Sequence, residues 1–386
     1  MTELEQAPPL IMAVDALGRT RLGRELAFRF DLARSVGARY AWRRFRYDVT
    51  GARRRGPFDP VYRAIWRDAA DALGAELVEL PAGLFELRAN GASTRVWRHC
   101  VMLDDAVTLR FAMQKALVHE RLSACALPVP EHLVFDAPDL SRAAEFLRLG
   151  PTPCVLKPVG DGGGSGVTAG VRTLAHLMRA RLRAWRTDEH LMIERQVTGE
   201  NYRLMFLDGE LLDVVRRGPP KVTGDGRSTI VELVEAENAR RAARAAQVLF
   251  WRLDIDLDCI FTLESLGLTP ASVLPAGRTV ALKTVVNQNT AEDNETVHAP
   301  VSEHLVGQAR AAAELLGVRL AGVDVITTDL TKPLSQSGGA IIEVNGTPGL
   351  SYHYDVRDRA NATRVAIPIL KSLLGASAAV GGRPAH

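Results

Sequence analysis

The sequence predicts an α/β (α+β) protein with two or three subdomains, and three observations support this fold class. The chain has 386 residues, which is long enough for two or three subdomains with a sizeable core. Segments with helical spacing of apolar residues alternate with short apolar runs that are typical of strands. One of these runs leads directly into a glycine-rich loop, an arrangement that suits a phosphate group.

The composition is ordinary for a soluble globular protein and argues against several classes of function. Hydrophobic residues make up 47% and charged residues 24% of the chain. The net charge of +3 is too small to indicate a nucleic-acid partner. The four cysteines form no CxxC pair, which favours a reduced, cytoplasmic chain over a disulfide framework or a zinc site. We expect neither a signal peptide nor a membrane span, because no long apolar run is present.

The chain is organised around residues 153–167, which read PCVLKPVGDGGGSGV. An apolar run that is typical of a buried strand ends at Lys157, and a loop rich in glycine follows. Glycines leave backbone N–H groups free to approach a phosphate, and the lysine can add a positive charge. The order differs from a Walker A loop, in which the lysine follows the glycines. A flexible surface turn is the alternative that the loop alone leaves open.

The first hundred residues predict a small α/β unit that precedes the main body. Residues 62–73 (YRAIWRDAADAL) have helical spacing, and residues 75–80 are typical of a strand. Residues 84–97 predict a hairpin that turns at Asn90-Gly91. We therefore place a domain at residues 1–104.

The remaining elements follow the same rules of periodicity and turn chemistry. Asp208-Gly209 predicts a hairpin turn between two strands, and Gly317 predicts the end of a helix. Helices are predicted at 104–126, 141–149, 173–185, 228–246, 302–316 and 363–374, and strands at 132–135, 191–197, 203–207, 210–215, 274–283, 320–327 and 339–345. The small and polar residues 375–386 predict a disordered tail.

Lysine is rare in this chain, so each lysine is informative. Only six lysines stand among the 48 basic residues, and the others are arginines. Lysine is a compact point charge that arginine does not replace at a tight site. Random drift in an arginine-rich sequence remains the alternative.

A candidate metal site lies on the last two predicted strands. Glu343 and Asn345 are two residues apart, so both side chains belong to one face of a strand. Asp324 lies in the preceding apolar strand. Three oxygen ligands on adjacent strands suit Mg²⁺, whose shell nucleotide phosphates would complete. Exposure to solvent or pairing with arginines is the alternative, but the apolar settings AIIEVN and AGVDVI disfavour it.

These motifs, taken in order, resemble the ATP-grasp superfamily, and in particular the ATP-grasp part of cyanophycin synthetase and related carboxylate–amine ligases. The resemblance covers residues 105–355 and rests on the lysine before the glycine loop, IERQVTGENYR, and GVDVITTDLTKPLSQSGGAIIEVNGTPGLSYH. It implies two α+β subdomains that grip ATP, at 105–195 and 196–374. It also implies ATP and Mg²⁺ as cofactors, with Mn²⁺ as an alternative metal.

Residue roles follow from the resemblance by position. Lys115 and Lys157 resemble the two lysines that contact ATP phosphates, and Arg203, Arg217 and Lys283 match basic positions near the transferred phosphate and the substrate carboxylate. Asp324, Glu343 and Asn345 match the metal ligands. The nucleotide-binding set implied is Lys115, Lys157, Gly162, Gly163, Gly164, Ser165, Gly166, Glu194, Val197 and Asn201, and the substrate set is Lys221, Asn287, Gly349 and His353.

Two residues and one segment keep more than one interpretation. Many family members have an acidic residue where this chain has Asn201, although asparagine can still hydrogen-bond a ribose hydroxyl. The segment NTAEDNE at 289–295 departs from the family's usual loop, and its acidic residues could bind an amine or simply face solvent. His353 could touch substrate, act as a base or have a structural role.

The resemblance implies an ATP-dependent acid–amino-acid ligase that joins two amino acids or small peptides through an acyl phosphate and releases ADP and phosphate. It implies small-molecule carboxylate and amine substrates and a homo-oligomer. The glycine loop would close as a lid, and we expect residues 161–166 to be poorly ordered without nucleotide. An ATP-grasp kinase and a non-catalytic ATP-binding module are the alternatives.

Overall fold

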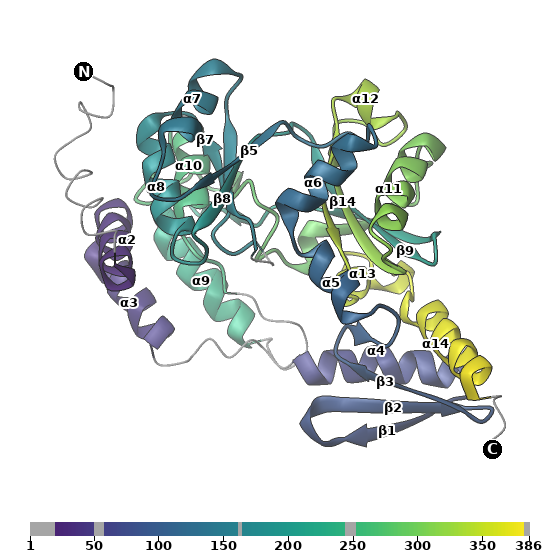
Figure 1. The fold of residues 1–386 in the computed structure, drawn as a ribbon. Helices are drawn as coiled ribbons and strands as arrows, with labels where there is room; N and C mark the ends of the chain where they lie inside the picture. Colours follow the sequence, from purple (N-terminus) through teal and green to yellow (C-terminus); the bar gives the residue numbers. More distant parts are fainter. Residues whose placement is uncertain (1–19, 50–57, 161–163, 244–251, 382–386) are drawn as a thin grey trace.

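The computed structural model describes residues 20–49, 58–160, 164–243 and 252–381. Within these residues the strands form four sheets, and every strand pair is antiparallel. The two larger bodies of the molecule carry one of these sheets each (Figure 1). Helices and antiparallel sheets together confirm the α+β class.

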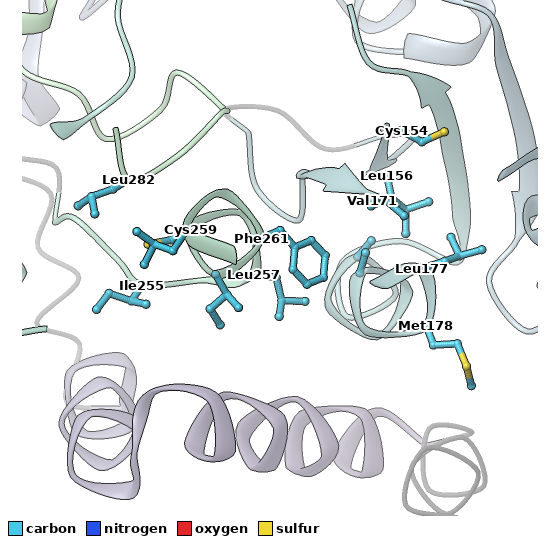
Figure 2. Packing of buried hydrophobic residues seen from close by; sticks show 14 of the residues in the cluster. Cys154, Leu156, Val171, Leu177, Met178, Ile255, Leu257, Cys259, Phe261 and Leu282 are labelled. Atoms are coloured by element: carbon cyan, nitrogen blue, oxygen red, sulfur yellow. The ribbon is translucent and has the colours of Figure 1, made fainter. Parts of the chain in front are cut away.

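The first body, the glycine-loop lobe, is built on a four-stranded sheet with helices packed against it. Apolar residues of sheet and helices share one core, which includes Leu156, Leu177 and Phe261. Figure 2 shows the side chain of Phe261 among these residues. The sheet order is β5 (His132–Asp136), β8 (His190–Arg195), β6 (Cys154–Pro158) and β7 (Thr168–Val171), and the helices are α7 (Ser141–Leu149), α8 (Leu174–Ala184) and α10 (Leu257–Ser265).

A segment far along the chain completes the same core. Ile230, Leu253 and Leu282 all belong to the core of the glycine-loop lobe. The segment contains β11 (Lys221–Thr223), α9 (Ile230–Ala243) and β12 (Thr279–Ala281). Residues 196–374 therefore do not pack as one unit, which differs from the predicted boundary between the two subdomains.

The second body, the carboxylate lobe, is built on a five-stranded sheet. The central strand β9 is buried on both faces: Leu204 and Phe206 contact one core, and Met205 and Leu207 contact another. The sheet order is β13 (Asn294–Thr296), β10 (Glu210–Arg217), β9 (Glu200–Leu207), β14 (Leu320–Thr327) and β15 (Ala340–Asn345), and its helices are α5 (Ala106–Ala112), α6 (Lys115–Ala124) and α11 (Glu303–Leu315).

The described part of the N-terminal region divides between two places. α2 (Arg21–Val36) and α3 (Ala38–Val49) form a hairpin beside α8, and Tyr40 enters the core of the glycine-loop lobe (Figure 1). The next helix and a small sheet lie on the opposite side of the molecule, against the C-terminal helix. These elements are α4 (Phe58–Leu73), β1 (Glu76–Leu80), β2 (Leu84–Ala89), β3 (Ala92–Trp97), β4 (Cys100–Val101) and α14 (Ala366–Gly381).

The single unit predicted for residues 1–104 is thus not what the described residues form. The apolar side chains of α2 pack against Leu182 of α8, whereas those of α4 pack against α14 and β9. Short helical turns complete the fold at η2 (Pro81–Gly83), η3 (Ala291–Asp293), α12 (Leu334–Ser337), α13 (Ser351–Tyr354) and η4 (Arg359–Asn361).

Most predicted elements are confirmed within one to three residues, and the turn chemistry explains why. Asn90 and Gly91 both have positive φ, as the two-residue turn of a twisted hairpin requires. Asp208 and Gly209 also have positive φ, in the turn between β9 and β10. The strand predicted at 320–327 matches β14 at both ends.

Three predictions are wrong in detail. The helix predicted at 104–126 is interrupted, because Gln114 leaves the helical region at ψ 82°. The apolar pattern continues across this break, so periodicity alone could not detect it. The strand predicted at 274–283 is limited to β12. Residues 375–381, predicted as disordered, continue α14, since alanine favours helix; residues 382–386 lie outside those described.

The search for membrane-spanning elements gave a negative result. Among the described residues, no helix combines the length and apolar character needed to cross a bilayer.

Trp66 of α4 allows a test of the packing between the small sheet and the carboxylate lobe. Its side chain is fully buried, and its indole N–H donates to Arg98 O at 2.8 Å. We expect Trp66→Ala to lower the free energy of unfolding by about 3–5 kcal/mol, because it leaves a cavity. Trp42 is 61% exposed, so Trp42→Ala should change it by less than about 0.5 kcal/mol. Urea unfolding of both variants checks this, and equal losses would contradict the packing described.

Candidate functional site

Lys157 and Glu194 form a buried ion pair on one face of the glycine-loop sheet. In the register of β6 and β8, Val155 lies opposite Glu194 and Lys157 lies opposite Met192, so the two charged residues are diagonal neighbours. Lys157 Nζ is 2.8 Å from Glu194 Oε2, and both side chains are 5% exposed. Each charge is stable inside the protein because the other is close.

His119 of α6 lies against this pair and joins the two lobes. Its Nε2 is 3.0 Å from Ile342 O on β15, and its Nδ1 is 4.0 Å from Glu194 Oε2 on β8. The ring also contacts the ring of His132 edge-on, with centroids 5.0 Å apart. Burial, followed by the positive charge of Lys157, lowers the pKa of His119 to about 3, so the imidazole is neutral near pH 7.

Lys115 is the first residue of α6, not the middle of a long helix as predicted. The break at Gln114 reorients the chain at this point. Lys115 Nζ is 3.5 Å from Glu343 Oε1, and the lysine side chain is 10% exposed. His119 follows one turn later on the same helix face.

The predicted metal ligands meet at one level of the carboxylate sheet. Asp324 of β14 lies opposite Glu343 of β15 on one side and opposite Arg203 of β9 on the other, and Gly322 lies opposite Asn345. Asn345 Nδ2 donates to Asp324 Oδ2 at 3.2 Å. This register is consistent with the expectation that Glu343 and Asn345 share one face of a strand, and it adds Asp324 to that face.

Asp324 is also bound by an arginine, which is the alternative that its apolar sequence setting disfavoured. Arg203 donates to Asp324 through Nε at 2.7 Å and through Nη2 at 2.6 Å, a bidentate pair. Burial opposes both charges, but the pair outweighs it: the pKa of Asp324 is lowered and the pKa of Arg203 is raised.

A second buried guanidinium gives this region an excess of positive charge. Arg217 of β10 is 9% exposed, and its Nη1 is 4.0 Å from Asp324 Oδ2. Burial and the neighbouring Arg203 lower the pKa of Arg217. Its Nε is buried and has no hydrogen-bond partner among the described residues. The ring of Tyr352 lies beneath both guanidiniums, 4.6 Å from that of Arg217 and 5.6 Å from that of Arg203.

His353 is fully buried beside this region, on α13. Its Nδ1 is 2.6 Å from Asp213 Oδ2 on β10, and Thr363 Oγ1 donates to the other oxygen of Asp213 at 2.8 Å. Burial lowers the pKa of His353. Its Nε2 has no hydrogen-bond partner within the described parts of the chain. Gly349 lies next to Tyr352 at the start of the same short helix.

Lys283 lies in a separate buried cluster at the base of the glycine loop. Its Nζ is 2.7 Å from Asp256 Oδ2, which also accepts from Arg183 Nη2 at 2.8 Å. Arg183 Nη1 in turn donates to Val167 O at the end of the loop, at 2.7 Å. Burial opposes ionisation of Asp256, but the two cations lower the pKa of this carboxyl group.

The described part of the glycine loop approaches the same segment. Asn287 Nδ2 donates to Gly164 O at 3.3 Å, and Gly164 has φ +71° with Asn287 Nδ2 only 2.7 Å from the place of a Cβ atom. Only glycine suits that position. Gly166 and Ser165 complete the turn, whereas Gly162 and Gly163 lie outside the described residues, so the expectation of poor order at residues 161–166 stays a prediction.

Other residues from the sequence analysis lie at the margins. Val197 follows β8, and Asn201 lies on β9 opposite Arg217 of β10. Lys221 is exposed on the edge of the two-stranded sheet. Asp293 closes a turn with Thr290, and Glu295 pairs with Arg216 at 2.7 Å. The site residues that the sequence did not reveal are His119, Asp256, Arg183 and Tyr352. For Asp256, the three aspartates in the apolar stretch DIDLDC were the available signal.

Comparisons with known proteins agree with this architecture. The chain is 31% identical over 248 residues to the cyanophycin synthetase of Trichormus variabilis, which covers 64% of this chain and 27% of the relative. It is 29% identical over 260 residues to a glutathione biosynthesis bifunctional protein of Mannheimia succiniciproducens, 65% of this chain and 34% of the relative. The chain thus spans about a quarter to a third of the length of these relatives. No family model matches the sequence.

The fold has a solved counterpart. A bifunctional glutathione synthetase from Pasteurella multocida aligns with a TM-score of 0.52 and 22% identity, over 82% of this chain and 44% of that one. The chain therefore has the ATP-grasp fold. Within that class of proteins, its sequence relates it to the cyanophycin synthetases.

Protonation of His119 gives a test of the buried contact between the lobes. A neutral histidine in the folded chain takes up a proton on unfolding below about pH 6.5. The free energy of unfolding should therefore fall as the pH drops from about 6.5 toward 3, by at most about 1.4 kcal/mol per pH unit from this group. His119→Gln should remove that part of the slope.

Urea unfolding at pH 7.5, 6.5 and 5.5 measures this slope. The charged groups around His119 are Lys157, Lys115 and Glu194, with His132 beside it, and all four remain in the variant. The lowered pKa of His353 contributes equally to both proteins and cancels in the difference. Identical slopes in the wild type and the variant would show that His119 is not held neutral.

Proposed function

We propose that the chain is an ATP-dependent carboxylate–amine ligase that forms an amide bond between two amino acids or small peptides. One observation carries the proposal: each lobe holds a cluster of charged side chains, and the neutral His119 contacts both lobes. Arg217, Arg203, Asp324, Glu343 and Lys115 form the cluster of the carboxylate lobe, and Glu194 and Lys157 form that of the glycine-loop lobe. Similarity to cyanophycin synthetases and a glutathione biosynthesis protein supports the same reaction class.

The reaction brings a carboxylate and an amine together at one site and proceeds in two steps. A carboxylate is a poor acyl donor, so one of its oxygens first attacks the γ-phosphorus of ATP, and the bond from that phosphorus to the β–γ bridging oxygen breaks. ADP leaves and an acyl phosphate remains. The amine nitrogen then attacks the acyl carbon, the carbon–oxygen bond to phosphate breaks, and the amine loses a proton.

The residues of this chain would position these groups and neutralise their charge. Lys157 and Lys115 are suited to the ATP phosphates, because both are positively charged side chains that are largely shielded from solvent. Arg217 and Arg203 together carry more positive charge than Asp324 neutralises, so an incoming carboxylate would be stabilised there. Lys283 would act near the loop, held by Asp256.

The carboxylate lobe suits a divalent cation that arrives with nucleotide. Asp324, Glu343 and Asn345 offer oxygen atoms from neighbouring strands. No group of three or more histidine, cysteine or acidic residues fit for a metal occurs in the described ranges, so phosphate oxygens would have to complete the shell. Mg²⁺ or Mn²⁺ bound there would supply charge neutralisation at the phosphates.

An assay of ADP release over pairs of amino acids, with mass spectrometry of the products, tests the ligase proposal. We expect ADP release to require both a carboxylate donor and an amine acceptor. The product should have the summed mass of the two substrates less one water. A kinase would release ADP with one acceptor alone, and a binding module would release none. Cytoplasmic location and a homo-oligomeric state stay predictions.

Lys157 offers the sharpest test of the nucleotide side. We expect Lys157→Ala to lower kcat/KM at least about 100-fold, because a preorganised positive charge that faces the bound nucleotide is lost. Lys332 is 56% exposed and pairs only locally with Asp329, so Lys332→Ala is the matched control and should retain activity. Initial rates of ADP release measure both, and a fully active Lys157→Ala variant would remove Lys157 from the proposed site.

Arg217 and Arg216 form a matched pair for the substrate side. Arg217 points to the buried face, whereas Arg216 pairs with Glu295 on the other face. We expect Arg217→Met to raise the KM for the carboxylate substrate about tenfold or more, while the KM for ATP changes little. Arg216→Met should leave both unchanged. Equal effects of the two substitutions would contradict the assignment of Arg217 to the carboxylate.

A further inference from the structure

His119 has one ring nitrogen whose role is fixed and one that is unused. A carbonyl oxygen can only accept, so the 3.0 Å contact with Ile342 O requires that Nε2 carries the hydrogen. In a neutral imidazole the other nitrogen, Nδ1, is then a hydrogen-bond acceptor. His119 is 1% exposed, and its Nδ1 has no hydrogen-bond partner in the described chain. Buried acceptors without a donor are uncommon in folded proteins.

A second acceptor faces the first. Glu194 Oε2 lies 4.0 Å from His119 Nδ1, too far for any direct hydrogen bond and with no hydrogen atom to share. Lys157 Nζ holds the same carboxylate oxygen in place at 2.8 Å. The edge-on contact with His132 and the bond to Ile342 hold the imidazole ring. The two acceptors are therefore fixed side by side, and a ligand that donates two hydrogens would satisfy both.

An amino group on an aromatic ring is such a donor. Adenine carries one at C6, with two hydrogens that diverge in the plane of the ring. Guanine carries a carbonyl oxygen at the same ring position, which would add a third acceptor. A site built to hydrogen-bond an N–H group rejects analogues that lack it, because its own buried polar atoms are then left unpaired.

We propose that His119 Nδ1 and Glu194 accept the two hydrogens of the adenine amino group, which makes His119 a residue that determines nucleotide specificity. The inference rests on the proposed ATP site and adds a residue that α6 places one turn after Lys115. The same helix would thus supply a charge for the phosphates from Lys115 and an acceptor for the base from His119.

Two substitutions separate this role from a structural one. In His119→Gln, the amide nitrogen can still reach Ile342 O, but the acceptor at the Nδ1 position is lost. In His119→Asn, an oxygen can take the place of Nδ1, but the contact with Ile342 is lost. A purely structural role would make His119→Asn the more harmful change for every nucleotide alike.

The measurement is the Kd of the full-length protein for ATP and for purine riboside triphosphate, which lacks the amino group. We expect the wild type to bind ATP about tenfold more tightly or better, the effect of one lost hydrogen bond with its unpaired acceptor. His119→Gln should lose most of that preference, and His119→Asn should keep most of it. Calorimetric titration gives both constants, and urea unfolding verifies that the variants are folded.

The outcomes are distinguishable from failure of the ligase proposal. If the wild type binds no nucleotide, the ATP site itself is wrong, and this inference falls with it. If ATP binds but both variants keep the wild-type preference, or lose affinity for the two nucleotides equally, His119 does not read the base and the inference alone is overturned. N6,N6-dimethyl-ATP, which has no hydrogen to donate, should bind the wild type as weakly as the purine analogue does.

Discussion

The buried pair between Arg203 and Asp324 is the interaction on which the carboxylate lobe depends. The two residues lie opposite each other on β9 and β14, and two short hydrogen bonds join them. A charge in this position is tolerated only with a partner, since removing one member would leave the other buried and unpaired. Gly322 makes the contact possible: a Cβ atom there would stand 3.4 Å from Arg203 Cδ and 2.8 Å from Pro348 Cβ.

Charge balance around that pair decides what the lobe can hold. Asp324 neutralises one guanidinium, and Arg217 brings a second one into the same buried region. A bound anion would restore neutrality, and Tyr352 already offers its ring face to both cations. The glycine-loop lobe differs, because Lys157 is already matched by Glu194. One lobe thus has unmatched positive charge near its carboxylates, and the other has paired charges beside an unused acceptor on His119.

The sequence predicted well those features of the site that depend on residues close together in the chain. Several features depend only on spacings of two to five residues, which periodicity detects directly. They are the apolar run that ends at Lys157, the shared face of Glu343 and Asn345, and the hairpin at Asp208-Gly209. Lys115 was identified by resemblance, but its position at a helix start was not, because an apolar pattern can continue across a break. The carboxylate partner of Lys283 was missed, since Asp256 is 27 residues away and reaches it only through packing.

By itself, then, the sequence determined which segments become strands, helices and turns, and which polar residues interrupt apolar runs. Those properties depend on the preferences of neighbouring residues. The tertiary structure alone decided that Arg203 rather than solvent binds Asp324, that α2 and α4 separate to opposite sides, and that His119 lies between Glu194 and Ile342. The contact between Arg203 and Asp324 joins residues 121 positions apart, and that between His119 and Ile342 joins residues 223 positions apart, so only tertiary packing brings them together.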